Sequence, residues 1–249
     1  MSNDIPKPER IAKVIAAAGV CSRREAESLI EQGRVTLNGQ KLKTPAVTVM
    51  PTDKITVDGR PLFTAEKKQP RLWVLHKPAG WITTARDPQG RPTVFENLPK
   101  KMGRVISVGR LDINSEGLLL LTNDGGLARM MELPKTGLPR EYRVRVYGAV
   151  DPDLLMELHN GIEFEGVHYK SIKATIEKRS GANTWLRVVL HEGKNREIRQ
   201  VMRAIGLQVN RLIRIAYGPF ELGDLKLEEV REVPDRALQT FCKQIGYAS

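Results

Sequence analysis

One carboxylate in an apolar setting is the first candidate for chemistry in this sequence. Asp112 follows Arg110 by two residues in VGRLDINSEGLLLLTNDG (108–125), just before a run of leucines. An isolated charge is costly to bury, so such a carboxylate is usually paired, hydrogen-bonded or chemically employed. Glu116 is the rival carboxylate and can equally tie a turn, and Asp124 is expected to form a structural Asx turn.

A stripe of arginines is the second candidate. The segment 195–206 (NREIRQVMRAIG) has apolar positions at helical spacing and is expected to be a helix capped by Asn195. Arg196, Arg199 and Arg203 lie beside the apolar face at i, i+3 and i+7. The pattern leaves three interpretations open: a solvated basic face, phosphate contacts, or an arginine that keeps a buried carboxylate ionised.

One tyrosine is a third candidate. Tyr142 alternates with Val144 and Val146, which places the three side chains on one face of a strand. The alternation favours a core tyrosine, but its ring would also offer a flat surface to a nucleobase.

Motifs for the common cofactors are missing. The sequence contains no G-x-x-x-x-G-K-[ST] loop, no G-x-G-x-x-G after a strand and no C-x-x-C, and no pair of its four histidines has metal-ligand spacing. We therefore expect no metal and no cofactor, with chemistry carried by ordinary side chains.

The charge of the chain predicts a polyanionic partner. The formal net charge is +11, which favours nucleic acid over a membrane because no apolar run approaches the length of a spanning helix. The two cysteines lie near opposite ends and the N-terminus shows no apolar signal segment, so a cytoplasmic location is expected.

The order of elements predicts two domains of an α+β protein. We expect a loose N-terminus over 1–8, a small domain over 9–63, a linker over 64–70 and a larger domain over 71–249. The larger domain shows no strict βαβ alternation, so a mainly antiparallel mixed sheet is predicted. Its strands are expected at 72–76, 141–148, 185–191 and 209–218, and its helices at 151–161, 195–206 and 234–246.

The small domain has an unusual helix start. Ser22 and Glu25 form a capping-box pattern, and Arg23 and Arg24 occupy the first turn, where cations oppose the helix dipole. They are either tolerated surface charges or part of a phosphate site.

The segment VIAAAGVCSRREAESLIEQGRVTLNGQ (14–40) resembles the S4 RNA-binding domain. The resemblance implies that Arg23, Arg24, Arg34 and Lys41 contact structured RNA.

Four ordered stretches of the larger domain resemble the motifs of the pseudouridine synthase family. They are HKPAGWITTARDPQGRPTVFENLP (76–99), the G-R-L-D stretch (108–125), REYRVRVYG (140–148) and EGKNREIRQVMRAIGLQVNRLIRI (192–215). The resemblance implies that uridine is isomerised to pseudouridine without a redox cofactor or an energy-rich donor. The form of the motifs is that of the group with S4 domains that acts on ribosomal RNA, and N-R-E-I-R resembles the large-subunit members most closely.

The resemblance also assigns roles to the candidates. Asp112 would be the catalytic carboxylate, attacking C1′ or removing the 2′ proton, and both routes stay open. Arg199 would pair with it and Tyr142 would stack on the flipped uracil. Arg110 would fill the gap left in the RNA or hold its backbone, and Arg196 and Arg203 would contact RNA backbone.

The expected partner is ribosomal RNA, 23S rRNA of the large subunit or a large-subunit assembly intermediate, bound by a monomer. The alternative is a non-catalytic S4-type RNA-binding or ribosome-assembly factor, which an intact set of Asp112, Tyr142 and Arg199 disfavours.

Overall fold

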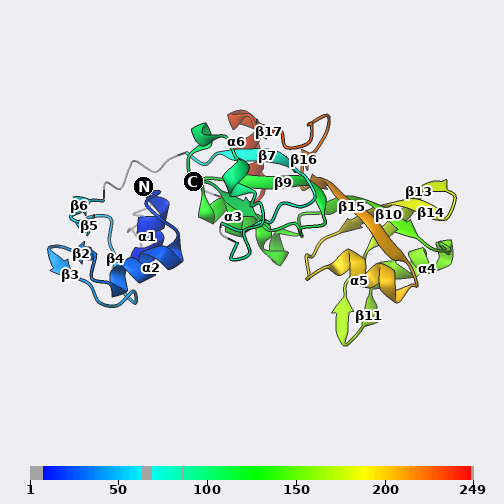
Figure 1. Ribbon diagram of the computed structural model, residues 1–249, viewed down its shortest axis with the longest axis horizontal. Coiled ribbons are helices and arrows are strands. Elements are labelled where there is room, and N and C mark those ends of the chain that lie inside the picture. Colours follow the sequence, from blue (N-terminus) through cyan, green and yellow to red (C-terminus); the bar gives the residue numbers. More distant parts are fainter. Residues whose placement is uncertain (1–7, 63–68, 86, 248–249) are drawn as a thin grey trace. The chain divides into compact units, whose positions relative to one another are not determined.

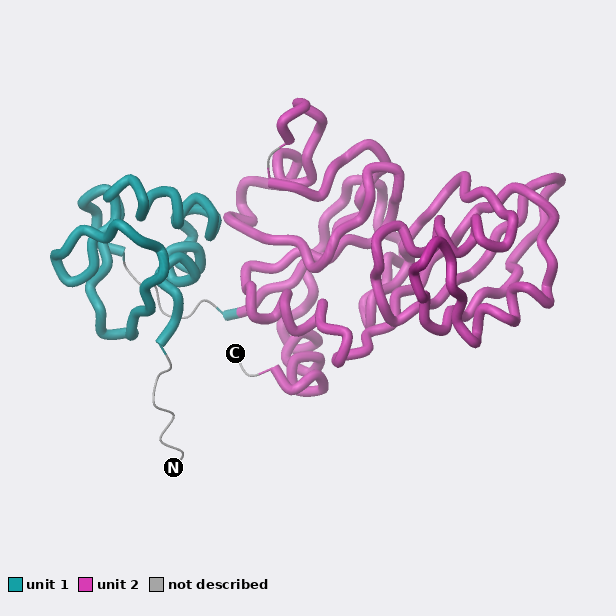
Figure 2. The backbone as a smooth tube through the Cα atoms, turned by 90° about the horizontal axis from the view of Figure 1, so that it is seen from below, with its two compact units in different colours: residues 1–69 teal, residues 70–249 magenta. Residues whose placement is uncertain are grey.

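Two compact units make up the chain, residues 1–69 and 70–249 (Figure 2). The computed structural model describes residues 8–62, 69–85 and 87–247, and each unit has its own hydrophobic core. Most of the expected loose N-terminus and linker falls outside the described residues, so the exact domain boundaries stay predictions.

The first unit packs two helices against short strands. Its elements are β1 (Glu9–Arg10), α1 (Ile11–Ala17), α2 (Arg23–Glu31), β2 (Val35–Leu37), β3 (Gln40–Lys41), β4 (Thr48–Val49), β5 (Ile55–Val57) and β6 (Arg60–Pro61). Strands β3, β2, β5 and β6 form an antiparallel sheet in that order, and β1 pairs with β4. Ile11, Ile15 and Ile30 are fully buried between the helices and the sheet.

The predicted start of α2 is confirmed. The Ser22 hydroxyl accepts a hydrogen bond from the Glu25 N–H at 3.2 Å, and the Glu25 carboxylate accepts one from the Ser22 N–H at 2.8 Å. Both bonds of a capping box are therefore present, and Arg23 and Arg24 occupy the first turn as expected.

The second unit is built on one large sheet. Its strands are β7 (Leu72–Lys77), β8 (Ile106–Val108), β9 (Glu116–Thr122), β10 (Arg140–Tyr147), β11 (Ile162–Phe164), β12 (Val167–Tyr169), β13 (Lys173–Ser180), β14 (Asn183–Leu190), β15 (Gln208–Tyr217), β16 (Phe220–Glu221) and β17 (Val230–Glu232). Its α-helices are α3 (Gly125–Glu132), α4 (Pro152–Glu157), α5 (Glu197–Ala204) and α6 (Asp235–Gln244), and its single-turn 3₁₀ helices lie at Phe95–Asn97, Lys100–Met102, Pro134–Thr136 and Leu158–Asn160.

The sheet runs β13-β14-β10-β15-β9-β7-β17, with β8 paired to β9 and β16 to β15 (Figure 1). The β9–β15 pairing is parallel, and the other strand pairings of this sheet are antiparallel. Strands β11 and β12 form a separate hairpin. The expected α+β class with a mainly antiparallel mixed sheet is confirmed.

Different helices cover the two faces of this sheet. On one face, α4 and α5 bury Leu155 and Val201 against Val144 and Leu186 of the β13-to-β15 half. On the other face, α3 and α6 join Leu118 and its neighbours over the β7–β9 half. In the residues that the structure describes, no helix is long and apolar enough to cross a membrane.

One prediction about helix α5 is wrong. The helix begins at Glu197, and the N-cap position belongs to Arg196 in a left-handed conformation (φ 49°), with no side-chain cap bond. Asn195 therefore does not cap the helix, and Arg196 lies at its edge rather than on a helical stripe with Arg199 and Arg203.

Candidate active site

The loop between β8 and β9 carries Asp112 to the start of the central strand. Its side chain is half-buried, and its carbonyl oxygen accepts a hydrogen bond from the Ser115 N–H at 3.0 Å. Strand β9 begins at Glu116, so the carboxylate precedes the buried leucines. This place in a loop lets it face a substrate, where a position within the strand would bury it.

A buried lysine holds the backbone of this loop. Lys77, at the end of β7, is fully buried and donates to the carbonyl oxygens of Pro78 at 2.9 Å, Asp112 at 3.1 Å and Ser115 at 2.9 Å. Burial lowers the pKa of Lys77 to about 8, although the charges of Asp112 and Glu116 act to raise it. Sequence reasoning missed this residue, and the available signal was a lysine that ends an apolar strand.

A glycine lets the central strands approach closely. Gly117 has φ +101°, and a Cβ there would lie 2.2 Å from the Arg214 carbonyl oxygen of β15. The same level of the sheet is shared by Lys77 on β7, Gly117 on β9, Arg214 on β15 and Tyr142 on β10. The backbone register thus aligns the lysine that holds the Asp112 loop with the candidate tyrosine three strands away.

Arg199 contacts the same loop from helix α5. Its guanidinium donates to the carbonyl oxygens of Asn114 at 3.0 Å and Val209 at 3.1 Å. Burial is the main cause of a lowered Arg199 pKa, Arg196 lowers it further, and the charge of Asp112 opposes both. Among the described residues Arg199 forms no ion pair with Asp112 within 4.0 Å, so the expected pairing stays a prediction.

Tyr142 lies in the core on the face covered by α5. It is 8% exposed and belongs to the cluster that contains Val144, Val146 and Ile198. The predicted sharing of one strand face with the two valines is therefore confirmed. The role in stacking on a base stays a prediction.

Glu116 has a structural partner. Arg211 donates two hydrogen bonds of 2.9 Å to its carboxylate and so lowers the pKa of Glu116. Asp124 caps helix α3 by accepting from the N–H groups of Gly126 at 2.6 Å and Leu127 at 3.0 Å, as the expected turn role requires. Both rivals of Asp112 are thus engaged in holding the fold.

The remaining RNA-binding candidates differ in their surroundings. In the second unit, Arg110 and Arg196 are exposed, whereas Arg203 pairs with Glu165 and stacks on the ring of Phe164. The expected RNA roles of these three arginines stay predictions.

In the first unit, Arg34 makes a bidentate pair with Asp58, with both hydrogen bonds at 2.7 Å. Arg23, Arg24 and Lys41 are exposed and form no ion pair with a carboxylate in the described ranges. These three side chains are available to an anion without breaking a contact.

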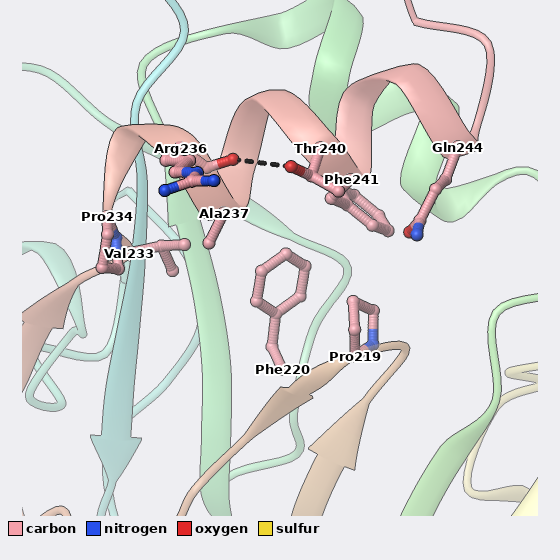
Figure 3. A pocket seen from close by; sticks show the side chains of 9 residues that line it. All are labelled: Pro219, Phe220, Val233, Pro234, Arg236, Ala237, Thr240, Phe241 and Gln244. Atoms are coloured by element: carbon pink, nitrogen blue, oxygen red, sulfur yellow. Dashed lines mark hydrogen bonds between the residues drawn. The ribbon is translucent and has the colours of Figure 1, made fainter.

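A surface groove lies elsewhere on the second unit, along helix α6 (Figure 3). The residues that line it are Pro219, Phe220, Val233, Pro234, Arg236, Ala237, Thr240, Phe241 and Gln244. None of them comes from the loop of Asp112, so the groove is not part of the candidate site. In the parts of the chain described here, no cluster of three His, Cys, Asp or Glu side chains could hold a metal ion.

Comparison with known proteins identifies the class. The model of the RNA pseudouridylate synthase family matches residues 71–204, and that of the S4 domain matches residues 9–55. The chain belongs to the RNA pseudouridylate synthase family, with an S4 domain before the catalytic domain.

Individual relatives agree with this assignment. The chain is 47% identical to an "Uncharacterized RNA pseudouridine synthase" of Rickettsia felis, over 93% of this chain and 99% of that protein. It is 46% identical to the "Ribosomal large subunit pseudouridine synthase B" of Shigella flexneri, over 86% of this chain and 75% of that protein. A crystal structure of a pseudouridylate synthase covers 93% of this chain and 98% of its own, with 26% identity and a TM-score of 0.65.

Proposed function

We propose that this chain converts a uridine of 23S ribosomal RNA, in the large subunit or an assembly intermediate of it, into pseudouridine in the cytoplasm. Family membership establishes the type of reaction, and the relatives named for the large ribosomal subunit support the substrate. The observation that carries the proposal is Asp112 in a loop that Lys77 and Arg199 hold from opposite directions along the chain.

The reaction needs a carboxylate fixed beside the ribose of the target nucleotide. Three carbonyl oxygens of the loop and its flank are bound by Lys77, so the backbone of Asp112 is held by a neighbouring strand. A side chain positioned in this way can act at C1′ or at the 2′ proton without a large reorganisation. Both routes begin from the ionised carboxylate.

The base must leave the RNA stack before its glycosidic bond can be broken and remade. We propose that the ring of Tyr142 supports the turned base and that Arg199 contributes positive charge beside Asp112. Arg110, exposed and two residues before Asp112, would then contact the RNA around the vacated position.

The S4 domain supplies affinity in this proposal. Arg23, Arg24, Arg34 and Lys41 would contact phosphates of the folded RNA, with Arg34 fixed by Asp58. Arg196 and Arg203 would contact the RNA backbone near the catalytic domain. One monomer carries both domains, so a single chain is sufficient for binding and chemistry.

Pseudouridine mapping in ribosomal RNA tests the proposal. RNA from cells with and without this protein is compared, and the deletion is complemented with wild type or with Asp112→Asn. We expect one 23S position to lose its pseudouridine in the deletion and regain it only with wild type. An unchanged 23S map, or full recovery with Asp112→Asn, would contradict the proposal and favour a binding role.

A further inference from the structure

Four strands of the large sheet, β13, β14, β10 and β15, have one covered face and one open face. Helices α4 and α5 pack on the side that buries Val144 and Leu186. The alternate side chains of β10 lie on the other side, where Arg143 and Arg145 are exposed and Tyr147 is 51% exposed.

The strand register arranges the open face into rows. Lys178 pairs with Trp185, Trp185 with Arg145, and Arg145 with Arg211, so one row crosses all four strands. Neighbouring strands lie about 4.8 Å apart, so the row is about 14 Å long. The next row includes Arg187 beside Arg143.

This face is basic even after its ion pairs are counted. The cations are Lys173, Lys178, Arg143, Arg145, Arg187 and Arg211, and the carboxylates are Glu116, Glu141 and Glu177. Each glutamate is bound to one arginine: Glu116 to Arg211, Glu141 to Arg187 and Glu177 to Arg143.

The other three cations, Lys173, Lys178 and Arg145, are exposed and form no ion pair with a carboxylate in the described residues. A surface with surplus positive charge attracts a polyanion.

Flat side chains lie among these cations. The guanidinium carbon of Arg143 lies 4.9 Å from the centre of the Trp185 ring, and Trp185 is itself only half-buried. Stacked arginine and aromatic side chains are surfaces on which unpaired bases of RNA stack. A stable protein partner would favour a core depleted of charge, which this face lacks.

The open face also ends beside the candidate active site. Arg211, the last residue of the first row, is bonded to Glu116, which begins β9 directly after the loop of Asp112. An RNA strand that leaves this loop region can therefore continue over the row of cations.

We propose that the open face of β13, β14, β10 and β15 binds the substrate RNA outside the segment that enters the candidate active site. Lys178, Arg145 and Lys173 bind phosphates, and Trp185 with Arg143 supports an unpaired base. The inference rests on the proposed function, because it takes RNA as the substrate.

The test compares two charge-neutralised variants of the full chain. Arg145→Gln with Lys178→Gln removes two cations from the open face. The control, Lys226→Gln with Lys243→Gln, removes two exposed lysines from elsewhere on the same unit. Binding to a large-subunit rRNA transcript is measured over a range of salt concentrations, and thermal midpoints confirm that all proteins are folded.

Two lost phosphate contacts should lower the slope of log K against log salt by about 1.4 to 1.8 for the open-face variant. The control should keep the wild-type slope. Equal slopes for wild type and the open-face variant, or equal losses in both variants, would overturn the inference. Wild-type turnover on the same transcript is a separate readout, so failure of the proposed function would appear there and leave the slope comparison intact.

Trp185 provides a second variant pair. Trp185→Phe keeps an aromatic ring, whereas Trp185→Leu removes it, and loss of one stacked base should weaken binding by roughly 5-fold to 100-fold in the leucine variant alone. Equal affinity of the two variants would contradict the stacking role.

Discussion

The ammonium of Lys77 donates to the carbonyl oxygen of Asp112 at 3.1 Å, so the reactive loop is held through its backbone by a charge that water does not reach. The same ammonium binds Pro78 and Ser115. The carboxylate of Asp112 stays available for chemistry because its main chain, rather than its side chain, takes part in this contact.

Replacement of Lys77 with methionine should destabilise the protein and slow the reaction. Three buried carbonyl oxygens would lose their donor, and one such loss costs about 1–3 kcal/mol. Urea unfolding and turnover on rRNA, measured on the same samples, check the expectation. A variant as stable and as fast as wild type would show that the loop holds itself.

The depressed pKa of Lys77 predicts a specific pH dependence of stability. Its pKa is about 8 in the folded protein and 10.5 in the unfolded chain. Between these values the unfolded state binds more protons, so this residue should make stability rise with pH by up to about 1.4 kcal/mol per unit. The difference in unfolding free energy between wild type and Lys77→Met, followed from pH 7 to about pH 10, should show this rise, and a flat difference would refute it.

Gly117→Ala should be among the most damaging small substitutions in the chain. The added methyl would meet the Arg214 backbone at 2.2 Å, and φ +101° is unfavourable for alanine. We expect a loss of about 2–5 kcal/mol in unfolding free energy.

Gly109→Ala is the matched control for this substitution. Gly109 also has a positive φ, of +66°, but a Cβ there would meet no atom within 4 Å. It should lose only about 1 kcal/mol. Similar losses in both variants would mean that strand approach does not require Gly117.

Glu116→Gln should leave the chemistry nearly intact. The glutamate is occupied by Arg211, and its exposed partner makes the pair worth about 1 kcal/mol or less. Turnover at saturating rRNA should stay close to wild type, with a small drop in thermal midpoint. Complete inactivity of a folded Glu116→Gln protein would reopen the choice between the two carboxylates.

Tyr142 can be tested without emptying its place in the core. Tyr142→Phe keeps the ring, and Tyr142→Leu keeps much of the apolar packing while removing the π surface, so each should cost no more than about 1.5 kcal/mol. Single-turnover rates should fall strongly for leucine and little for phenylalanine if the ring supports the base. Equal rates at equal stability would leave Tyr142 as a core residue only.

Local patterns predicted the parts of the fold that local chemistry determines. The capping box at Ser22 and the alternation around Tyr142 both follow from neighbouring residues, and both are present. Strand β9 did not show itself, because Leu118 and Leu119 pack into cores on opposite faces of the sheet and the period of two is hidden by a continuous apolar run. Helix α3 was missed because it begins with two glycines, which are poor helix formers.

The site was predictable as residue types but not as an arrangement. Asp112 and Tyr142 stood out by context and by resemblance. The role of Lys77 depends on three carbonyl groups that meet only after β7 and β9 pair. The row through Trp185 and Arg145 likewise depends on register and on a bulge in β13, neither of which a single sequence specifies.

The central claim is that Asp112 performs the chemistry on RNA, and one comparison of purified proteins tests it most directly. Wild type and Asp112→Asn are mixed with the large-subunit rRNA transcript, and pseudouridine formation, RNA affinity and thermal midpoint are measured for each. We predict that the asparagine variant keeps its affinity and its fold but loses at least about 10³-fold in rate, as expected when the group that attacks or deprotonates the substrate is removed. A folded Asp112→Asn protein that forms pseudouridine at close to the wild-type rate would contradict the account.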